Sequence, residues 1–174
     1  MKWSWFRLEG EAKAERSADR FESFFRQEYR RLAGGLFVLT GDAKEAEDLA
    51  QEAMARVFER WDRVQAMESP TGYLFRTALN LHRKRLRRAG VRARRDLSPE
   101  LPPDPLAAVD DRDHLRRLLS SLTDGQREAL VLTEVGGFDA EEAGRLLGVE
   151  AATVRTRVHR ARMSLRQMTE DRDG

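Results

Sequence analysis

Residues 139–168 read DAEEAGRLLGVEAATVRTRVHRARMSLRQM, a short helical pattern followed by a glycine and a longer helical pattern. Asp139 and Glu142 have the spacing of a capping box, which predicts the start of the short helix. Gly148 allows a tight turn, and the longer helix is predicted over about residues 150–168. Two helices joined in this way are typical of the helix-turn-helix of DNA-binding proteins.

The longer helix carries its positive charge on one side. Its apolar residues step by four and three and predict a buried seam, formed by Val154, Val158, Ala161, Leu165 and Met168. No acidic residue occurs between Ala151 and Thr169, whereas a helix that only faces solvent usually mixes both signs. The residues predicted to contact DNA lie off the seam and are Arg155, Thr156, Arg157, His159, Arg160 and Arg162. Arg157 and Arg162 point more sideways and suit phosphates, while the other four share a face that suits base edges.

A second basic segment follows a predicted helix with aromatic residues. Residues 83–95 contain eight basic and no acidic residues. One interpretation is a solubilising helix end, where positive charges also interact favourably with the helix dipole. Behind a helix with aromatic residues, the segment is more typical of a groove in which rings stack on unstacked bases and arginines hold the backbone. Asn80 either contacts a base or is a buried, hydrogen-bonded amide; the spacing favours neither. The candidates for this second DNA contact are Tyr73, Asn80, Arg83, Lys84 and Arg87.

A group of acidic residues lies in the helix predicted before these two. The group comprises Glu45, Glu47, Asp48 and Glu52, together with Gln51. No histidine or second carboxylate motif accompanies it, so a solvated face or a protein-docking surface is favoured over a metal or acid–base site. The sequence also lacks a phosphate-binding glycine loop, a nucleophile elbow and a zinc signature. We therefore expect a binding protein without a cofactor, and not an enzyme.

Prolines and helical periodicity divide the chain. Four of the five prolines fall within residues 99–105, and such a cluster cannot continue a helix. The predicted organisation is an N-terminal extension (1–17), a helical domain (18–91), a flexible Pro-rich linker (92–110), a second helical domain (111–168) and a tail (169–174). Helices are predicted over about residues 18–39, 43–61 and 70–89 in the first domain, and 111–122, 123–135, 140–147 and 150–168 in the second. The fold class is all-α, with two small helical domains.

The composition excludes several other classes of protein. The 174 residues include no cysteine and only three histidines, so disulfides, thiolate nucleophiles and Cys or His metal centres are not expected. Of 32 basic residues 28 are Arg, which reflects a GC-rich genome or favours phosphate and guanine recognition. No apolar run approaches the roughly 20 residues of a membrane helix, and the N-terminus is not a secretory signal. A soluble, cytoplasmic protein without membrane insertion is expected.

Three segments together resemble the extracytoplasmic-function (ECF) group of bacterial RNA polymerase sigma factors. They are GDAKEAEDLAQEAMARVFERWDRV (41–64), SPTGYLFRTALNLHRKRLRR (69–88) and LTDGQREALVLTEVGGFDAEEAGRLLGVEAATVRTRVHRARMSLR (122–166). The resemblance covers about residues 20–90 and 112–167, and the combination in this order is highly specific, whereas the helix-turn-helix alone is a weak signal. The resemblance implies a three-helix region 2 in the first domain and a helix-turn-helix region 4 in the second.

The resemblance also implies partners and residue roles. The DLAQEA helix would dock on the clamp helices of the polymerase's largest subunit, through Glu47, Asp48, Gln51 and Glu52. The loop at 62–69 and the next helix would capture a flipped base of the −10 promoter element, with Asn80 matching the family's asparagine and Tyr73 standing where many relatives have Trp. The last helix would read the −35 element through Arg155, Thr156, His159 and Arg160. Region 4 would contact the polymerase flap, the acidic linker would run toward the active centre, and an anti-sigma protein is a further implied partner.

Some positions depart from the family pattern. Ala143 and Gly144 stand where relatives often have Ile and Ala, which predicts looser packing of the helix-turn-helix, and Glu150 predicts a weaker N-cap. The N-terminal extension, with Trp3, Trp5 and Phe6, is either a disordered tail or a small regulatory contact, and no C-terminal regulatory domain is expected. The main alternative function is a helix-turn-helix transcription regulator that acts without polymerase. A metal-dependent enzyme built on Glu45, Asp48 and Glu52 is a distant third.

Overall fold

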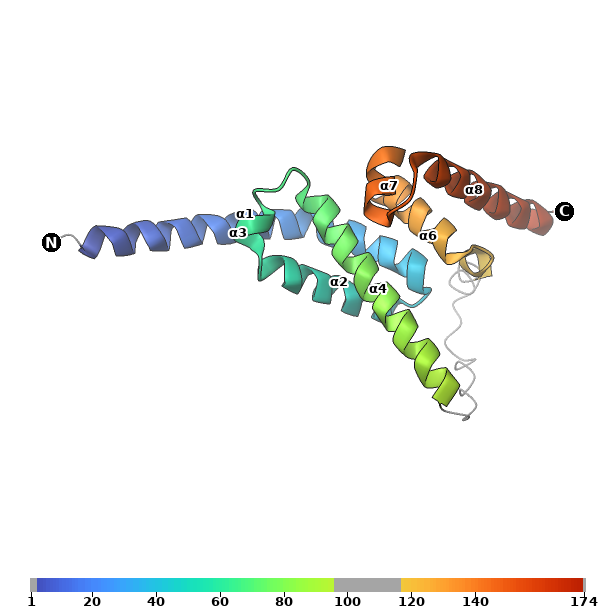
Figure 1. The fold of residues 1–174 in the computed structure, drawn as a ribbon, viewed down its shortest axis with the longest axis horizontal. Helices are drawn as coiled ribbons and strands as arrows, with labels where there is room; N and C mark the ends of the chain where they lie inside the picture. The colour runs from blue at the N-terminus through green and yellow to red at the C-terminus, as the bar shows by residue number, and fades with distance from the viewer. Residues whose placement is uncertain (1–2, 96–116, 174) are drawn as a thin grey trace.

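The computed structural model describes residues 3–95 and 117–173, with side chains for residues 15–90 and 117–170. Every regular element in this part of the chain is a helix, as predicted (Figure 1). None of the described helices is both long enough and apolar enough to cross a membrane.

The N-terminal domain contains four helices. They are α1 (Trp3–Thr40), α2 (Ala43–Phe58), α3 (Trp61–Val64) and α4 (Pro70–Arg95). The side chain of Asp42 caps α2 by accepting a hydrogen bond of 2.8 Å from the backbone nitrogen of Glu45. The apolar stripe of α2 is buried between α1 and α4, with Leu49, Ala50 and Val57 fully enclosed. Because this stripe faces inward, the acidic residues of the same helix face outward.

The C-terminal domain contains the predicted helix-turn-helix. Its elements are α6 (Asp124–Leu130), the π-helical η2 (Val131–Val135), α7 (Ala140–Leu147) and α8 (Ala151–Asp173). Capping boxes start α6 at Thr123 and α7 at Asp139, which confirms both predicted helix starts. Gly148 has a φ of 72°, a left-handed conformation that turns the chain from α7 into α8.

Three predicted boundaries differ from the structure. Helix α1 begins at Trp3 and not near residue 18, so the predicted N-terminal extension is part of the first helix. The residues before position 18 favour a helix because they include Ala, Glu, Lys and Arg and no proline. Helix α2 ends at Phe58, because Trp61 turns inward and starts the short helix α3 in the predicted polar loop. Helix α4 reaches Arg95, into the predicted linker. The remainder of that linker and residues 111–116 of the next predicted helix lie outside the described residues.

The two helical domains pack against each other, which the prediction of two domains joined only by a linker does not include. Figure 1 shows α6 and α7 beside α1 and α4, with α8 on the far side of α6 and α7. Helix α1 contacts both η2 and α6, and α4 contacts α7. The rings of Phe75 in α4 and Phe138 before α7 meet edge to face, with centroids 5.5 Å apart. Buried residues of both domains therefore form one continuous apolar cluster.

Candidate nucleic-acid interface

Helix α8 presents the predicted arginine face to solvent. Val154, Val158 and Ala161 are buried against the rest of the C-terminal domain, and Leu165 and Met168 are half-buried, as the apolar spacing predicts. The exposed residues of the predicted set are Arg155, Thr156, His159, Arg160 and Arg162. These five side chains form a surface with three arginines and no carboxylate of α8 among them.

Arg157 differs from its neighbours on α8. It is half-buried, and its guanidinium lies over Gly125 of α6, where a Cβ would come within 3.1 Å of the Arg157 Cζ. Gly125 therefore allows the arginine to lie flat against α6. This placement holds Arg157 at the edge of the exposed face, which fits the sideways direction predicted for it.

Two exposed ion pairs partly occupy the α8 face. The Nη1 of Arg155 lies 3.0 Å from Oε1 of Glu141, and the Nη2 of Arg162 lies 2.5 Å from Oε1 of Glu134. All four side chains are exposed, and such surface pairs contribute only about 0.2–1 kcal/mol because water and salt screen them. A phosphate could replace either carboxylate at little cost in free energy.

The helix-turn-helix is tightly closed at Gly144. A Cβ on this residue would lie 2.7 Å from the backbone oxygen of Val149, and Ala143 beside it is fully buried. The expectation that Ala143 and Gly144 loosen the packing is therefore wrong, because the missing side-chain atoms let the backbone turn approach α7 more closely. At the start of α8, the backbone oxygen of Glu150 accepts hydrogen bonds from Thr153 and Val154.

Helix α4 carries the second predicted DNA contact. Asn80, Lys84 and Arg87 are exposed along one face, so the interpretation of Asn80 as a buried amide is wrong. Tyr73 lies at the start of the same face and is half-buried, and its hydroxyl accepts a hydrogen bond of 3.2 Å from Arg60. The spacing of seven residues between Tyr73 and Asn80, and again between Asn80 and Arg87, places these residues on one side of the helix.

Two further basic residues belong to this region and are absent from the predicted set. Arg76 is exposed one turn after Tyr73, and Arg60, in the turn between α2 and α3, donates a hydrogen bond to the Tyr73 hydroxyl. The three-residue spacing from Tyr73 could have identified Arg76 from the sequence. Nothing in the sequence relates Arg60 to Tyr73, since the two are brought together by the turn at α3.

Arg83, one of the predicted DNA contacts on α4, forms an ion pair with a residue of the C-terminal domain. Its Nε and Nη2 donate hydrogen bonds of 2.6 and 2.7 Å to the two carboxylate oxygens of Glu128 in α6. Glu128 is only 7% exposed. The hydrogen bond to Glu128 raises the pKa of Arg83, although burial acts in the opposite direction. A two-point charge-assisted pair of this kind is specific in geometry as well as in charge.

The acidic face of α2 is accessible. Glu47, Asp48 and Gln51 are exposed, and the half-buried Glu52 accepts ion pairs from Arg56 at 2.7 Å and Arg85 at 3.4 Å. In the part of the chain that the structure describes, no three His, Cys, Asp or Glu side chains converge on a possible metal position. Among the described residues, the acidic side chains of α2 therefore form an exposed surface and not a converging carboxylate cluster.

The sequence matches two family models that together cover most of both domains. Sigma-70 region 2 matches residues 24–92, and Sigma-70 region 4 matches residues 112–165. The RNA polymerase sigma-E factor of Streptomyces avermitilis is 32% identical over 160 residues, which cover 88% of this chain and 87% of that protein. The chain belongs to the ECF sigma factors.

Other comparisons agree with this assignment. The ECF RNA polymerase sigma factor SigE of Mycolicibacterium smegmatis is 36% identical over 84% of this chain, which spans 60% of the length of that longer protein. The fold is similar to that of the sigma factor RpoE of Bartonella quintana, solved in complex with the anti-sigma factor NepR. The similarity has a TM-score of 0.72, with 24% identity over 87% of this chain and 97% of that one. Sigma factors are transcription initiation factors that bind core RNA polymerase and promoter DNA, and they are not enzymes.

Proposed function

We propose that this sigma factor uses residues 18–91, region 2, to dock on core polymerase and to capture the −10 element, and residues 111–168, region 4, to read the −35 element. The observation that carries the proposal is the separation of three exposed surfaces: the acidic face of α2, the Tyr73–Arg87 face of α4 and the arginine face of α8. Each surface suits a different partner. A single helix-turn-helix regulator would require only the third.

In this proposal, α2 binds the clamp helices of the largest polymerase subunit. Glu47, Asp48 and Gln51 present two carboxylates and an amide to a basic partner, while Glu52 supports the face through Arg56 and Arg85. Complementary charge of this kind speeds association and sets orientation. Region 4 would contact the flap, so that polymerase holds both domains at the spacing of the two promoter elements.

Helix α4 would act on single-stranded DNA at the −10 element. A base that leaves the stack would be held by the Tyr73 ring and the amide of Asn80, while Lys84 and Arg87 contact the backbone. Arg60 would keep the tyrosine ring in place through its hydroxyl, at 3.2 Å. Unstacking costs about a few kcal/mol per base, which phosphate contacts and polymerase binding would offset.

Helix α8 would enter the major groove of the −35 element. Arg155, Thr156, His159 and Arg160 face the base edges, and Arg157 and Arg162 lie where the phosphate backbone passes. The site of action is the cytoplasm, where polymerase and promoters are found. The complex of the structurally similar sigma factor with NepR supports an anti-sigma protein as a further partner.

The test is runoff transcription with core polymerase, this protein and a library of promoter sequences. We expect specific initiation at a subset that shares two short motifs. A matched reaction uses the Asn80→Ala variant, which should bind core polymerase normally and lose initiation. Sequence-independent or absent initiation with the unaltered protein would refute the proposed function.

A further inference from the structure

We propose that Glu28 of α1 is a positioning residue for the capture of the −10 base: its carboxylate fixes the first turn of α4, the turn that carries Tyr73. This inference rests on the proposed function, because it takes Tyr73 and Asn80 as the residues that hold the flipped base. Glu28 itself is only 3% exposed, so it would act through α4 and not by touching DNA. Its contacts, and the geometry of the first turn of α4, support this role.

The carboxylate of Glu28 holds the second residue of α4. Its Oε1 accepts a hydrogen bond of 3.1 Å from the hydroxyl of Thr71, 43 residues later in the chain. The N–H groups of a first helical turn lack partners within the helix, and the helix dipole places positive charge there, so a carboxylate beside this turn is favoured. Because Glu28 is buried, loss of the hydroxyl would deprive its Oε1 of a hydrogen bond where water cannot easily replace it.

A second contact joins the same two helices one turn further along. The Nη2 of Arg31 lies 2.8 Å from Oε2 of Glu28, and the guanidinium carbon of Arg31 lies 5.7 Å from the centroid of the Phe75 ring. A guanidinium at this distance over a ring is attracted by the π-electrons. Thr71 and Phe75 are four residues apart and share a face of α4. Two successive turns of α4 are therefore held by α1, and rotation of α4 about its axis would break both contacts.

Tyr73 lies on the other side of the first turn. Residues of an α-helix are about 100° apart around the axis, so the two-residue step from Thr71 to Tyr73 turns the side chain by about 200°. On that other side, Arg60 donates a hydrogen bond of 3.2 Å to the Tyr73 hydroxyl. The ring is thus fixed from two directions, because Arg60 holds its tip and Glu28 holds the turn that carries it. A displacement of about 1 Å is enough to weaken a positioned contact strongly.

The other hydrogen bonds of this turn are internal to it. The Oγ of Ser69 accepts a hydrogen bond of 3.0 Å from the backbone nitrogen of Gly72, which stabilises the start of α4 without relating it to α1. The hydroxyl of Thr77 donates to the backbone oxygen of Tyr73 at 2.8 Å, also within α4. The hydroxyl of Thr71, in contrast, reaches another helix. The two threonines therefore form a matched pair for an experiment.

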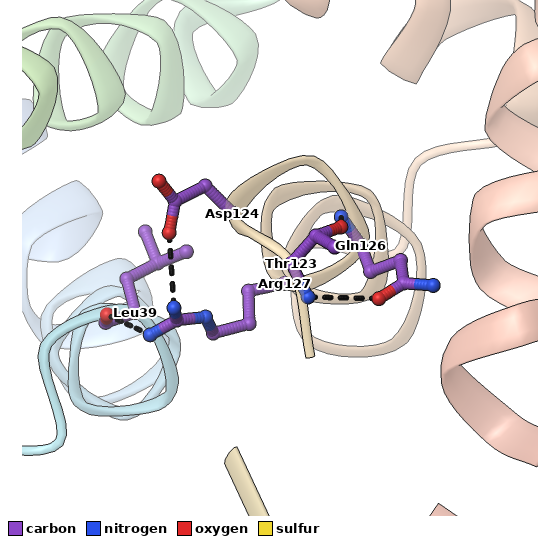
Figure 2. Close-up of polar contacts among 5 residues, drawn as sticks. All are labelled: Leu39, Thr123, Asp124, Gln126 and Arg127. Atoms are coloured by element: carbon purple, nitrogen blue, oxygen red, sulfur yellow. Dashed lines mark hydrogen bonds and ion pairs between the residues drawn. The ribbon is translucent and has the colours of Figure 1, made fainter. Parts of the chain in front are cut away.

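Helix α1 has a further external hydrogen bond near its C-terminal end. Figure 2 shows Arg127 of α6, whose Nη1 donates to the backbone oxygen of Leu39 at 3.2 Å while its Nη2 lies 2.9 Å from Oδ1 of Asp124. This contact joins α1 to α6 and does not involve α4. A variant without it loosens α1 but leaves the first turn of α4 intact, and so separates a general effect on α1 from the proposed one.

The experiment measures promoter opening by holoenzyme assembled from core polymerase and the full chain, on a promoter identified by runoff transcription. Fluorescence of 2-aminopurine in the −10 element reports the unstacking of bases, and the dependence of its rate on holoenzyme concentration separates promoter binding from the opening step. Thr71→Val keeps the shape of the side chain and removes its hydroxyl. We expect the opening rate to fall about tenfold, a typical factor for one hydrogen bond to a charged group, while promoter binding and binding to core polymerase stay unchanged.

Three further variants serve as controls. Thr71→Ser keeps a hydroxyl at the same position and should restore the opening rate. Thr77→Val makes the same chemical change two turns along α4 and should open promoters at the unaltered rate, because the lost hydrogen bond is internal to the helix. Arg127→Gln removes the hydrogen bond to Leu39 and should also leave the opening rate unchanged.

Glu28→Met tests the other partner of the hydrogen bond. The substitution replaces the carboxylate with an apolar side chain of similar length, and Arg31, whose side chain is 38% exposed, can turn to water. Opening should slow as it does in Thr71→Val. The double variant should open no more slowly than either single variant, because both changes remove the same hydrogen bond. If Glu28→Met does not fold, the comparison of Thr71→Val with Thr71→Ser decides.

Each outcome has a defined meaning. Slower opening in Thr71→Val, restored in Thr71→Ser and absent from Thr77→Val and Arg127→Gln, supports the proposal. Opening at the unaltered rate in Thr71→Val overturns it, because the hydrogen bond would not affect base capture. An equal loss in either control, or weaker promoter binding in place of slower opening, also overturns it, because the effect would then be a general loosening of the domain. Failure of the unaltered protein to open any promoter refutes the proposed function and is read before the variants are compared.

Discussion

The indole nitrogen of Trp61 donates a hydrogen bond of 2.9 Å to the backbone oxygen of Ser17, 44 residues earlier in the chain. This bond fixes α3 against the middle of α1, where the Trp61 ring also contacts Phe21 and Phe24 at centroid distances of 5.4 and 5.1 Å. The contact determines where α2 stops and where the loop before α4 begins. The position of the proposed base-capture residues therefore depends on a residue outside that site.

Replacing Trp61 should destabilise region 2 in two separable steps. Trp61→Phe keeps most of the ring and loses the hydrogen bond, at a cost of about 1 kcal/mol. Trp61→Ala also empties an aromatic cluster, at a cost of about 3–5 kcal/mol. Urea unfolding followed by circular dichroism measures both. Equal losses in the two variants would show that the hydrogen bond, and not the ring packing, holds α3.

Removal of Arg160 should weaken −35 recognition without affecting polymerase. The side chain is exposed on α8, so Arg160→Ala removes one base or phosphate contact, and we expect a loss of about 1–3 kcal/mol, or 5- to 150-fold, in −35-dependent initiation. Arg155→Ala should act in the same way. Binding to core polymerase, measured by size-exclusion chromatography, should be unchanged, and its loss would contradict the role given to α8.

Asp48→Ala should weaken binding to core polymerase. Asp48 is exposed, so the change removes a charge from the proposed docking face without altering the core of region 2. We expect the affinity for core polymerase to fall about tenfold at low salt, and by less at high salt, where ions screen the charge complementarity. Glu22→Gln removes an exposed carboxylate from α1 and is the control. If both variants bind core polymerase as well as the unaltered protein does, the acidic face of α2 is only a solvated surface.

Gly144→Ala should destabilise the helix-turn-helix. The new Cβ would lie 2.7 Å from a backbone oxygen that cannot rotate away, and such overpacking costs about 1–3 kcal/mol. Gly90→Ala is the matched control, because its Cβ meets open space in α4 and should stabilise that helix by about 0.5–1 kcal/mol. Thermal unfolding distinguishes the two. A stabilised Gly144→Ala variant would mean that α7 and the turn move apart easily.

The stability of the protein should fall in mildly acidic solution because of His82. Burial lowers the pKa of this histidine, against the raising effect of Glu45, Glu128 and Asp124, while Arg127 lowers it further. As pH falls through the ordinary histidine value of 6.5, the unfolded chain binds a proton that the folded chain does not. The free energy of unfolding therefore decreases below that pH and levels off under the folded-state pKa.

The measurement is chemical unfolding at a series of pH values between about 7.5 and 5.5, above the range in which most carboxylates titrate. His82→Leu should flatten the pH dependence of the free energy of unfolding, because the titrating group is removed. The substitution breaks no hydrogen bond at Nδ1, since this buried atom has no hydrogen-bond partner. A slope that persists in His82→Leu would assign the effect to another group.

The local features of this fold can be predicted from short stretches of sequence. The capping boxes at Thr123 and Asp139, the turn at Gly148 and the buried seam of α8 depend on contacts between residues a few positions apart, so spacing reports them directly. The same holds for the exposed faces of α2 and α4. Helix ends that depend on distant partners, such as the stop before Trp61, were not predictable in this way.

The all-α fold and the outward sides of α2, α4 and α8 can be predicted from the sequence, because helical periodicity and charge are local properties. The family was indicated by a different signal, the resemblance of three segments to the ECF sigma factors. The shared core of the two domains, the pairing of Glu128 with Arg83, and the close approach of Gly35 but not Gly34 to η2 became visible in the folded molecule. These contacts join residues from 45 to about 100 positions apart. Their formation depends on shape and burial across two surfaces, which no local pattern encodes.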